Sequence, residues 1–234
     1  MNTRVASLLA CLLLVPTVPL SAGEEDKDIR WLAVKNLRVD QVNPTLLMID
    51  DEETRETREE SRIAIAVRGI FPIKRQQELV AATTENMGDV IFLDYILERQ
   101  ALPEDASTKS EPKWERVNVK VAQNILKTAA GIDQVVADGS VISQVFTMPL
   151  PARGDGHWDK KVTHPKLKRQ EGQLLFRYLD FDIEPGTYYR YRVRLKIANP
   201  LYDSQTTNPF LSAGETRATP WSRPSPSVFV TNAK

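Results

Sequence analysis

The sequence predicts an α+β protein in two parts, an α/β unit over residues 62–148 and an antiparallel β unit over residues 173–234. Strand-type and helix-type patterns alternate through the first part, as they do in α/β units. The second part holds two runs of alternating apolar and charged residues with a Pro-Gly pair between them. Residues 149–172 have no regular pattern. Loops of that length are uncommon inside compact domains, so we place the boundary between the units there.

Residues 1–23 have the composition of a secretory signal peptide. Arg4 supplies a positive charge, residues 5–20 are mostly apolar, and Ser21-Ala22-Gly23 offers a cleavage point. The apolar run contains prolines and is shorter than the roughly 20 residues of a membrane-spanning helix. We expect a protein exported to the periplasm or cell surface, without a stable membrane span after cleavage. The alternatives are a retained anchor or a lipid on Cys11, the sole cysteine, whose removal would leave no disulfide or thiolate ligand.

Residues 24–61 are expected to form an N-terminal strand followed by a charged linker. The strand is predicted over residues 29–39, which are rich in branched and aromatic side chains. Residues 49–62 have no apolar face and carry acidic and basic side chains in close alternation. That pattern indicates a solvated linker or a surface helix with ion pairs one turn apart. An acidic patch that attracts cations is the other interpretation.

The α/β unit is predicted from a succession of local signals. A proline at the first helical position, Pro72, and a glycine after the helix, Gly88, mark its first helix. The Asp138-Gly139 pair predicts a turn. The resulting order is strand 62–71, helix from 72, strand 90–102, strand 114–119, helix 121–130 and strand-like residues 132–146. This order is that of a ferredoxin-like α+β sandwich.

The antiparallel unit begins with two strand patterns in residues 174–197. In the second, apolar Tyr189, Tyr191, Val193, Leu195 and Ile197 alternate with Arg190, Arg192, Arg194 and Lys196. In the first, Leu175, Leu179, Phe181 and Ile183 share a face that Arg177 interrupts. A direct hairpin would place Asp182 opposite Arg190 and Asp180 opposite Arg192, and opposite charges across a ladder favour that register.

A second interpretation comes from a resemblance to a known family. The segments Ile183-Glu-Pro-Gly-Thr-Tyr-Tyr189 and Trp221-Ser-Arg-Pro-Ser-Pro226 resemble the second half of a fibronectin type III domain. The resemblance implies strands that cross between two sheets at the Pro185-Gly186 turn and a last strand over residues 227–231. It also implies that the Tyr189 hydroxyl bonds backbone near that turn. Members of this family bind and space other molecules and seldom catalyse.

The whole chain is also similar to exported bacterial proteins of uncharacterised function. The shared feature is a tryptophan, Trp158, followed by Thr163-His164-Pro165-Lys166 ahead of the strand pair. This resemblance implies export to the bacterial envelope and carries no activity with it.

The charge balance limits the classes of partner. The chain has 31 basic and 31 acidic residues, which argues against nucleic-acid binding because phosphate neutralisation needs a cationic excess. The second half is locally basic through two groups of residues. They are Lys160, Lys161, Lys166, Lys168 and Arg169 in the loop, and Arg190, Arg192, Arg194 and Lys196 in the strand. These side chains could bind an anionic glycan, lipopolysaccharide or, locally, nucleic acid. They could equally protect a sheet edge and a loop from aggregation.

Few residues offer catalytic chemistry. Neither a Gly-x-Ser-x-Gly motif nor a phosphate-binding glycine loop is present. A zinc site is conceivable at His157 and His164 with Asp155 and Asp159, although their spacing matches no helix or strand pair. The other interpretation is a pair of loop histidines, one of them in a Thr-His-Pro turn. Arg153-Gly154-Asp155 is either an adhesion motif or a turn.

Together these observations predict a non-enzymatic interaction module of the bacterial envelope that needs no cofactor and contacts an envelope protein. The candidate contact residues are Arg190, Arg192, Arg194, Lys196, Trp158 and Trp221. The alternatives are a periplasmic metal-dependent hydrolase that uses the loop with His157 and His164, and a binder of anionic polymers such as glycans.

Overall fold

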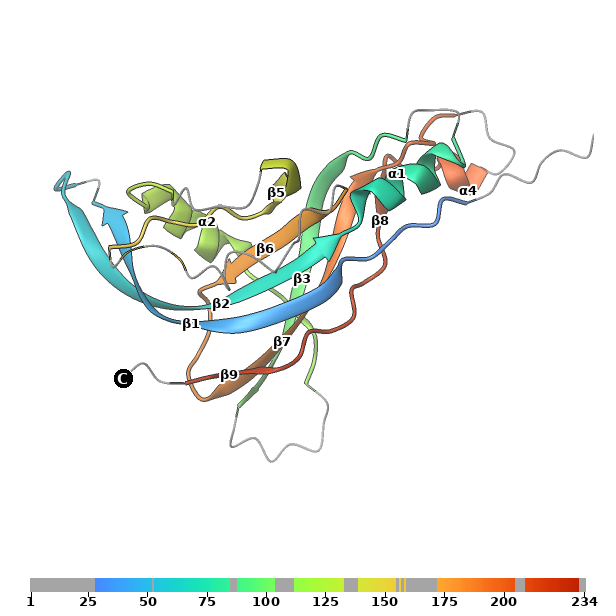
Figure 1. Cartoon of the computed structure of the whole chain (residues 1–234). Coiled ribbons are helices and arrows are strands. Elements are labelled where there is room, and N and C mark those ends of the chain that lie inside the picture. Colours follow the sequence, from blue (N-terminus) through green and yellow to red (C-terminus); the bar gives the residue numbers. More distant parts are fainter. Residues whose placement is uncertain are drawn as a thin grey trace, which may run out of the picture.

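The computed structural model describes residues 28–51, 53–84, 88–103, 112–132, 139–154, 156, 158, 172–204 and 209–231. Its strands form two sheets (Figure 1). Sheet A has the order β1-β2-β6-β5, and sheet B has the order β4-β3-β7-β8, with β9 also paired to β7. The strands of sheet A are β1 (Lys35–Asp50), β2 (Thr57–Phe71), β6 (Leu174–Asp180) and β5 (Ile142–Thr147). Those of sheet B are β4 (Glu115–Arg116), β3 (Phe92–Pro103), β7 (Thr187–Ala198), β8 (Thr216–Ala218) and β9 (Val228–Val230).

The helices are short, and local signals account for the two longer ones. They are α1 (Ile73–Ala81), α2 (Val119–Thr128), the 3-10 turn η1 (Gly139–Val141) and α4 (Pro209–Ser212). Helix α1 starts after Pro72 as predicted, but it ends at Ala81, so Gly88 is not its C-terminal cap. Helix α2 starts where the Asn118 side chain accepts a hydrogen bond of 3.2 Å from the Lys120 backbone, which is a standard N-cap.

One apolar core joins the two sheets. Central strand β2 contributes a buried run, Ala64-Ile65-Ala66-Val67, which packs on both faces of sheet A. Tyr95 of sheet B meets Phe176 of sheet A edge to face at 5.5 Å. Phe92 likewise touches Phe71 at 5.3 Å. Edge-to-face aromatic pairs of this kind add to the hydrophobic contribution of their buried area.

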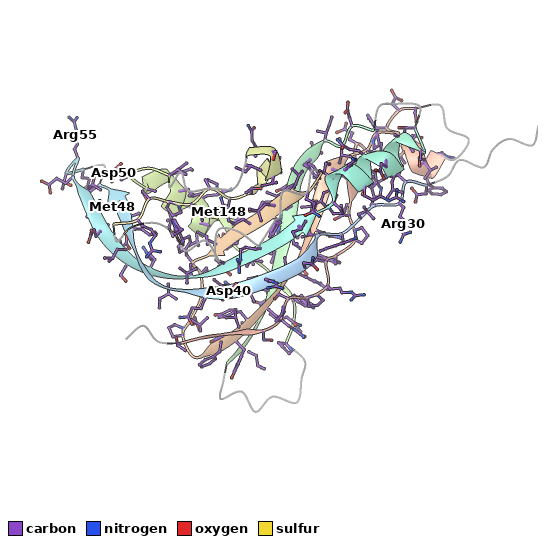
Figure 2. All side chains as sticks on the ribbon, viewed as in Figure 1. Arg30, Asp40, Met48, Asp50, Arg55 and Met148 are labelled. Atoms are coloured by element: carbon purple, nitrogen blue, oxygen red, sulfur yellow. The ribbon has the colours of Figure 1, made fainter. Side chains whose placement is uncertain are left out.

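The charged segment 49–62 is not a linker or a helix, which corrects that prediction. It forms the outer end of a long β1–β2 hairpin, whose tip carries Asp50 and Arg55 in Figure 2. The Asp51 carboxylate closes the turn by accepting hydrogen bonds from the backbone of Glu53 and Thr54. Backbone pairing between β1 and β2 continues to the end of the hairpin, so these residues form strand without an apolar face.

The coarse α+β class is confirmed, whereas the ferredoxin-like arrangement is wrong. The predicted strands and helices of residues 62–148 are largely present, but β2 and β5 lie in sheet A while β3 and β4 lie in sheet B. Strand β2 pairs with β6, and β3 pairs with β7. Residues 62–148 and 173–234 therefore share both sheets, and the predicted boundary at 149–172 does not separate two cores.

The direct hairpin between residues 174–183 and 189–197 is also wrong. Strand β6 lies in sheet A and β7 in sheet B, so the chain crosses between sheets at Pro185 and Gly186. Gly186 has a φ of 76°, which favours glycine, and its N–H donates to Val230. The Tyr189 hydroxyl accepts a hydrogen bond of 2.9 Å from the Glu184 N–H, which confirms its expected bond to backbone near the turn.

Arg177 interrupts the apolar face predicted for residues 175–183. Its place in β6 shows how the core accommodates a charged side chain. The strand is buried on both faces, and the Arg177 side chain lies inside with its residue 1% exposed. Its Nε donates to the Met148 carbonyl at 2.7 Å. Burial lowers the pKa of Arg177 to about 10.

Candidate interaction surface

Strand β7 carries a row of cations on the face of sheet B that points away from the core. The five apolar residues from Tyr189 to Ile197 are at most 3% exposed, whereas the arginines between them are half-buried and Lys196 is exposed. The predicted alternation is therefore confirmed. Across the ladder on β3, Gln100 lies opposite Arg190, Glu98 opposite Arg192, and Asp94 opposite Lys196.

The segment before β9 attaches to β7 through a repeating hydroxyl pattern. Thr219, Ser222 and Ser225 each form two hydrogen bonds with one residue of β7. The backbone N–H of each donates to the carbonyl of its β7 partner, and its side-chain oxygen accepts a hydrogen bond from the N–H of that partner. The donor–acceptor distances are 2.8–3.0 Å, and the partners are Leu195, Val193 and Tyr191 respectively. A spacing of three residues matches the turn of a polyproline II helix. This attachment holds Trp221 beside the β7 arginines.

Two indole rings alternate with three guanidinium groups on this face. We call this set the Trp–Arg ladder: Arg190, Trp114, Arg192, Trp221 and Arg194. The Arg192 guanidinium carbon lies 4.5 Å from the Trp114 ring centre and 4.4 Å from that of Trp221. Arg190 lies 5.6 Å from Trp114, and Arg194 lies 4.5 Å from Trp221. Each such contact is worth about 0.5–2 kcal/mol, depending on exposure, so the ladder holds long side chains in place.

The ladder is only partly neutralised. Glu98 accepts from Nε of Arg192 at 2.8 Å and forms an ion pair with its Nη2 at 2.6 Å. Arg190 donates to the neutral Gln100 amide oxygen. Within the described ranges, Arg194 has a buried Nε without a hydrogen-bond partner and no carboxylate in ion-pair contact. The surface therefore offers a net positive charge.

Apolar and basic residues adjoin the ladder. Beyond Arg190, Tyr188 is 40% exposed and its ring lies 4.7 Å from that of Phe229. Trp221 also lines a groove of about 600 Å³ between residues 33–37 and the segment from Trp221 to Pro224. Lys35 and Arg223 add two cations to its lining. The candidate surface thus combines the exposed Tyr188 and half-buried aromatic rings with fixed positive charge.

Asp180 and Asp182, which a direct hairpin would place opposite β7 arginines, pair instead with an arginine of β3. Asp180 is buried and accepts from Nη1 of Arg99 at 2.9 Å and from the Tyr191 hydroxyl at 3.0 Å. Asp182 pairs with the same arginine at 3.0 Å. Burial raises the pKa of the Asp180 carboxyl, although the Arg99 cation opposes that shift. This cluster ties the two sheets together.

Trp158 is not part of a contact surface, which corrects its assignment. It is 2% exposed, and its indole N–H donates to the Pro151 carbonyl at 2.7 Å. The guanidinium of Arg153 covers its ring at 5.5 Å. Gly154 bonds the Leu46 carbonyl through its N–H. The first two positions of the Arg-Gly-Asp tripeptide therefore pack against the β1 side of the core.

The remaining candidates lie outside the described residues. These are the signal peptide (1–23), Asp155, His157, Asp159, His164 and the loop cations from Lys160 to Arg169. Elsewhere in the described ranges, His, Cys, Asp and Glu side chains form no group of three or more that could hold a metal ion. The described helices include none with the length and apolar character to span a bilayer.

Sequence reasoning missed two parts of the surface. Trp114 received no role, because nothing local indicates that it stacks on arginines far along the chain. The hydroxyl pattern Thr219-x-x-Ser222-x-x-Ser225, with prolines between, was a usable signal for a segment that follows a strand edge.

Comparison with protein-family models, curated proteins and solved structures produced no match to this chain.

Proposed function

We propose that this chain is an exported, non-enzymatic interaction module of the bacterial envelope and that the Trp–Arg ladder is its contact surface for a protein partner. The observation that carries the proposal is the alternation of Trp114 and Trp221 with Arg190, Arg192 and Arg194 on the face of sheet B that points away from the core. Tryptophan and arginine are the residue types that most often dominate binding energy at protein interfaces.

Pre-organisation supports this choice of surface. Ordering a long side chain at an interface usually opposes binding, but the stacked rings, Glu98 and Gln100 already hold the arginines in place. The positive charge of Arg190, Arg194, Lys35 and Arg223 favours a partner with an acidic surface and increases the association rate at low salt. The partner would also cover the Tyr188–Phe229 pair.

The likeness to a fibronectin type III half-sandwich remains part of the proposal. Three features of residues 174–231 support it. They are the bond from Glu184 to the Tyr189 hydroxyl, the crossing between sheets after β6, and the Trp221–Pro226 segment alongside β7. Such domains commonly present binding surfaces on a rigid frame, which agrees with an interaction role.

The experiment is site-specific photo-crosslinking of the full chain in cells. A photoreactive phenylalanine analogue would replace Tyr188 in one variant, Arg223 in a second and Lys127, on α2, in a control. We expect one envelope protein to be crosslinked at positions 188 and 223 but not at 127. Adducts that are equal at all three positions, or that never form, contradict the proposed surface. Fractionation that finds the processed chain in the cytoplasm contradicts the export.

A second candidate function is binding of an anionic polymer such as a glycan, favoured by the cations of the groove that have no carboxylate partner among the described residues. A heparin column tests it with the double variant Lys35→Glu, Arg223→Glu and the matched control Lys120→Glu, Lys127→Glu on α2. Retention lost only in the first variant supports polymer binding. Equal elution of both variants contradicts it.

A further inference from the structure

Two oppositely charged surfaces of this protein lie at opposite ends of strand β1. The groove beside Trp221 is lined by residues 33–37, at the start of the strand, and the turn of the β1–β2 hairpin follows its last residue, Asp50. Strand β1 has 16 residues, so a rise of about 3.3 Å per residue separates its ends by roughly 40–50 Å. Figure 2 shows Asp50 and Arg55 at one end of the molecule and Arg30, which precedes β1, towards the other.

The groove is positively charged. Lys35 and Arg223 are exposed, and the lining contains no acidic residue. Neither cation takes part in an ion pair within the described ranges. Arg194, which stacks on Trp221, adds a buried Nε without a hydrogen-bond partner there. A groove of about 600 Å³ holds a few side chains and not a broad surface, so it favours a narrow, protruding occupant with negative charge.

The acidic surface is the tip of the β1–β2 hairpin, which we define as residues 50–60. It has seven acidic and two basic residues. Residues 53–59 are all exposed. The tip protrudes from the sheet, because β6 pairs with β2 only from Ile65 to Phe71 and leaves the outer end of the hairpin two-stranded among the described strands (Figure 1). It therefore has the shape and charge that the groove favours.

The hairpin tip is also pre-organised. The Asp51 carboxylate accepts hydrogen bonds from the backbone N–H groups of Thr54 and Glu53 at 3.1 and 2.9 Å. These bonds lower the pKa of the Asp51 carboxyl, so the turn keeps this charge at neutral pH. The side chains of Glu53 and Glu56 make no ion pair with the described residues and remain available to a partner. A fixed turn loses little conformational freedom on binding, which favours association.

The hairpin tip and the groove cannot neutralise each other within one molecule. Their separation is several times the Debye length of about 8 Å at physiological ionic strength. The tip of one copy can nevertheless enter the groove of another copy. Such a contact joins two different surfaces, so each copy keeps one unused tip or groove and the assembly can grow as an open chain.

We propose that this protein associates head to tail, with the acidic hairpin tip of one copy bound in the basic groove of the next. Lys35 and Arg223 receive the carboxylates of the tip, and Arg194 adds positive charge beside them. This inference rests on the proposed function, because it names a second copy of the chain as the protein partner of the contact surface.

The test is sedimentation velocity of the purified full chain over a series of concentrations. At low salt the mean sedimentation coefficient should rise with concentration, and about 500 mM salt should abolish that rise. One variant, Lys35→Glu with Arg223→Glu, reverses the charge of the groove. A second, Glu53→Lys with Glu56→Lys, reverses the charge of the tip. Each variant alone should associate about tenfold or more weakly, and an equal mixture of the two should regain association because opposite charges meet again.

The matched controls reverse the same number of charges elsewhere. They are Lys120→Glu with Lys127→Glu, and Asp89→Lys with Glu215→Lys, all at exposed positions. Both controls should associate like the unaltered chain, and all four variants should keep its Tm. The proposal is overturned if the unaltered chain stays monomeric at about 100 μM in low salt. Equal weakening in the controls, or a mixture of the groove and tip variants that stays monomeric, overturns it too.

Photo-crosslinking in cells distinguishes this inference from the proposed function. Adducts at positions 188 and 223 with a different envelope protein, together with a purified chain that stays monomeric, support the contact surface and overturn head-to-tail association. Association that depends on the charges of the tip and the groove, in a chain that fractionates with the cytoplasm, supports head-to-tail association and overturns the envelope role.

Discussion

The hydroxyl of Tyr191 donates a hydrogen bond of 3.0 Å to the buried carboxylate of Asp180, and this bond connects β7 of sheet B with β6 of sheet A. Arg99 of β3 completes the connection from the same side as Tyr191. The two sheets are thus held by a polar cluster inside an apolar core. Its members depend on one another, because each removes the desolvation penalty of its neighbour.

Replacing Arg99 by methionine is expected to lower the free energy of unfolding by about 3–5 kcal/mol, since it leaves a buried carboxylate without its cation. The side chains of Arg99 and Asp180 are 17% and 1% exposed. Urea unfolding measures the change. Arg75→Met is the control, because Arg75 belongs to an exposed pair with Glu78 and should change stability by about 0.5 kcal/mol or less. Similar losses in both variants would argue against the cluster's role.

The hydrogen bond at the crossing between sheets can be tested with Tyr189→Phe. The variant deprives the Glu184 N–H of its acceptor and should lower the free energy of unfolding by about 1 kcal/mol. Tyr202→Phe, at a position that is 50% exposed, serves as control and should be neutral. Equal stability of the two variants would mean that this bond does not support the turn.

The attachment of the Trp221 segment predicts a strong effect of Ser222→Ala. The variant leaves the buried Val193 N–H without its side-chain acceptor and should reduce stability by about 1–3 kcal/mol. It should also speed hydrogen exchange at Val193 and alter the tryptophan fluorescence, since Trp221 is held by this segment. Ser227→Ala, at an exposed position, is the matched control. Unchanged exchange at Val193 would refute the proposed attachment.

The phenol of Tyr95 should make the protein less stable at alkaline pH. Burial and Asp94 raise its pKa to about 12 in the folded state, against about 10 in the unfolded chain. The contribution of this phenol to the free energy of unfolding is therefore complete below pH 10. It is lost as the pH rises from 10 towards 12, because in that window the Tyr95 phenol ionises in the unfolded chain but not in the folded protein. Urea unfolding at pH 9 and pH 11 should show a smaller drop for Tyr95→Phe than for the unaltered chain. An equal drop would contradict the raised pKa.

Local signals correctly indicated most elements of this fold. Period-two alternation identified the buried face of β7, Pro72 marked the start of α1, and the Tyr189 hydroxyl found backbone near the turn as expected. These features depend on neighbours within a few residues. Three of the five residues of the Trp–Arg ladder followed from the same alternation, which turns Arg190, Arg192 and Arg194 outward.

The charge pattern of β6 and β7 misled because it has two solutions. Asp180 and Asp182 could match the arginines of β7, or they could meet an arginine from a distant strand. The structure selects Arg99, which lies 81 residues before Asp180. Cross-strand pairs specify register only after the neighbouring strand is known.

The sequence by itself determined which residues are apolar, where strands and helices begin, and which face of β7 is buried, because these follow from side-chain periodicity and backbone preference. The tertiary structure decided that β2 pairs with β6 and β3 with β7, and it buried Trp158 while stacking Trp114 and Trp221 between arginines. Alternation shows that one face of a strand is buried, but it does not show which element covers that face. The reason is that the hydrophobic effect is non-directional, so any apolar surface can cover another.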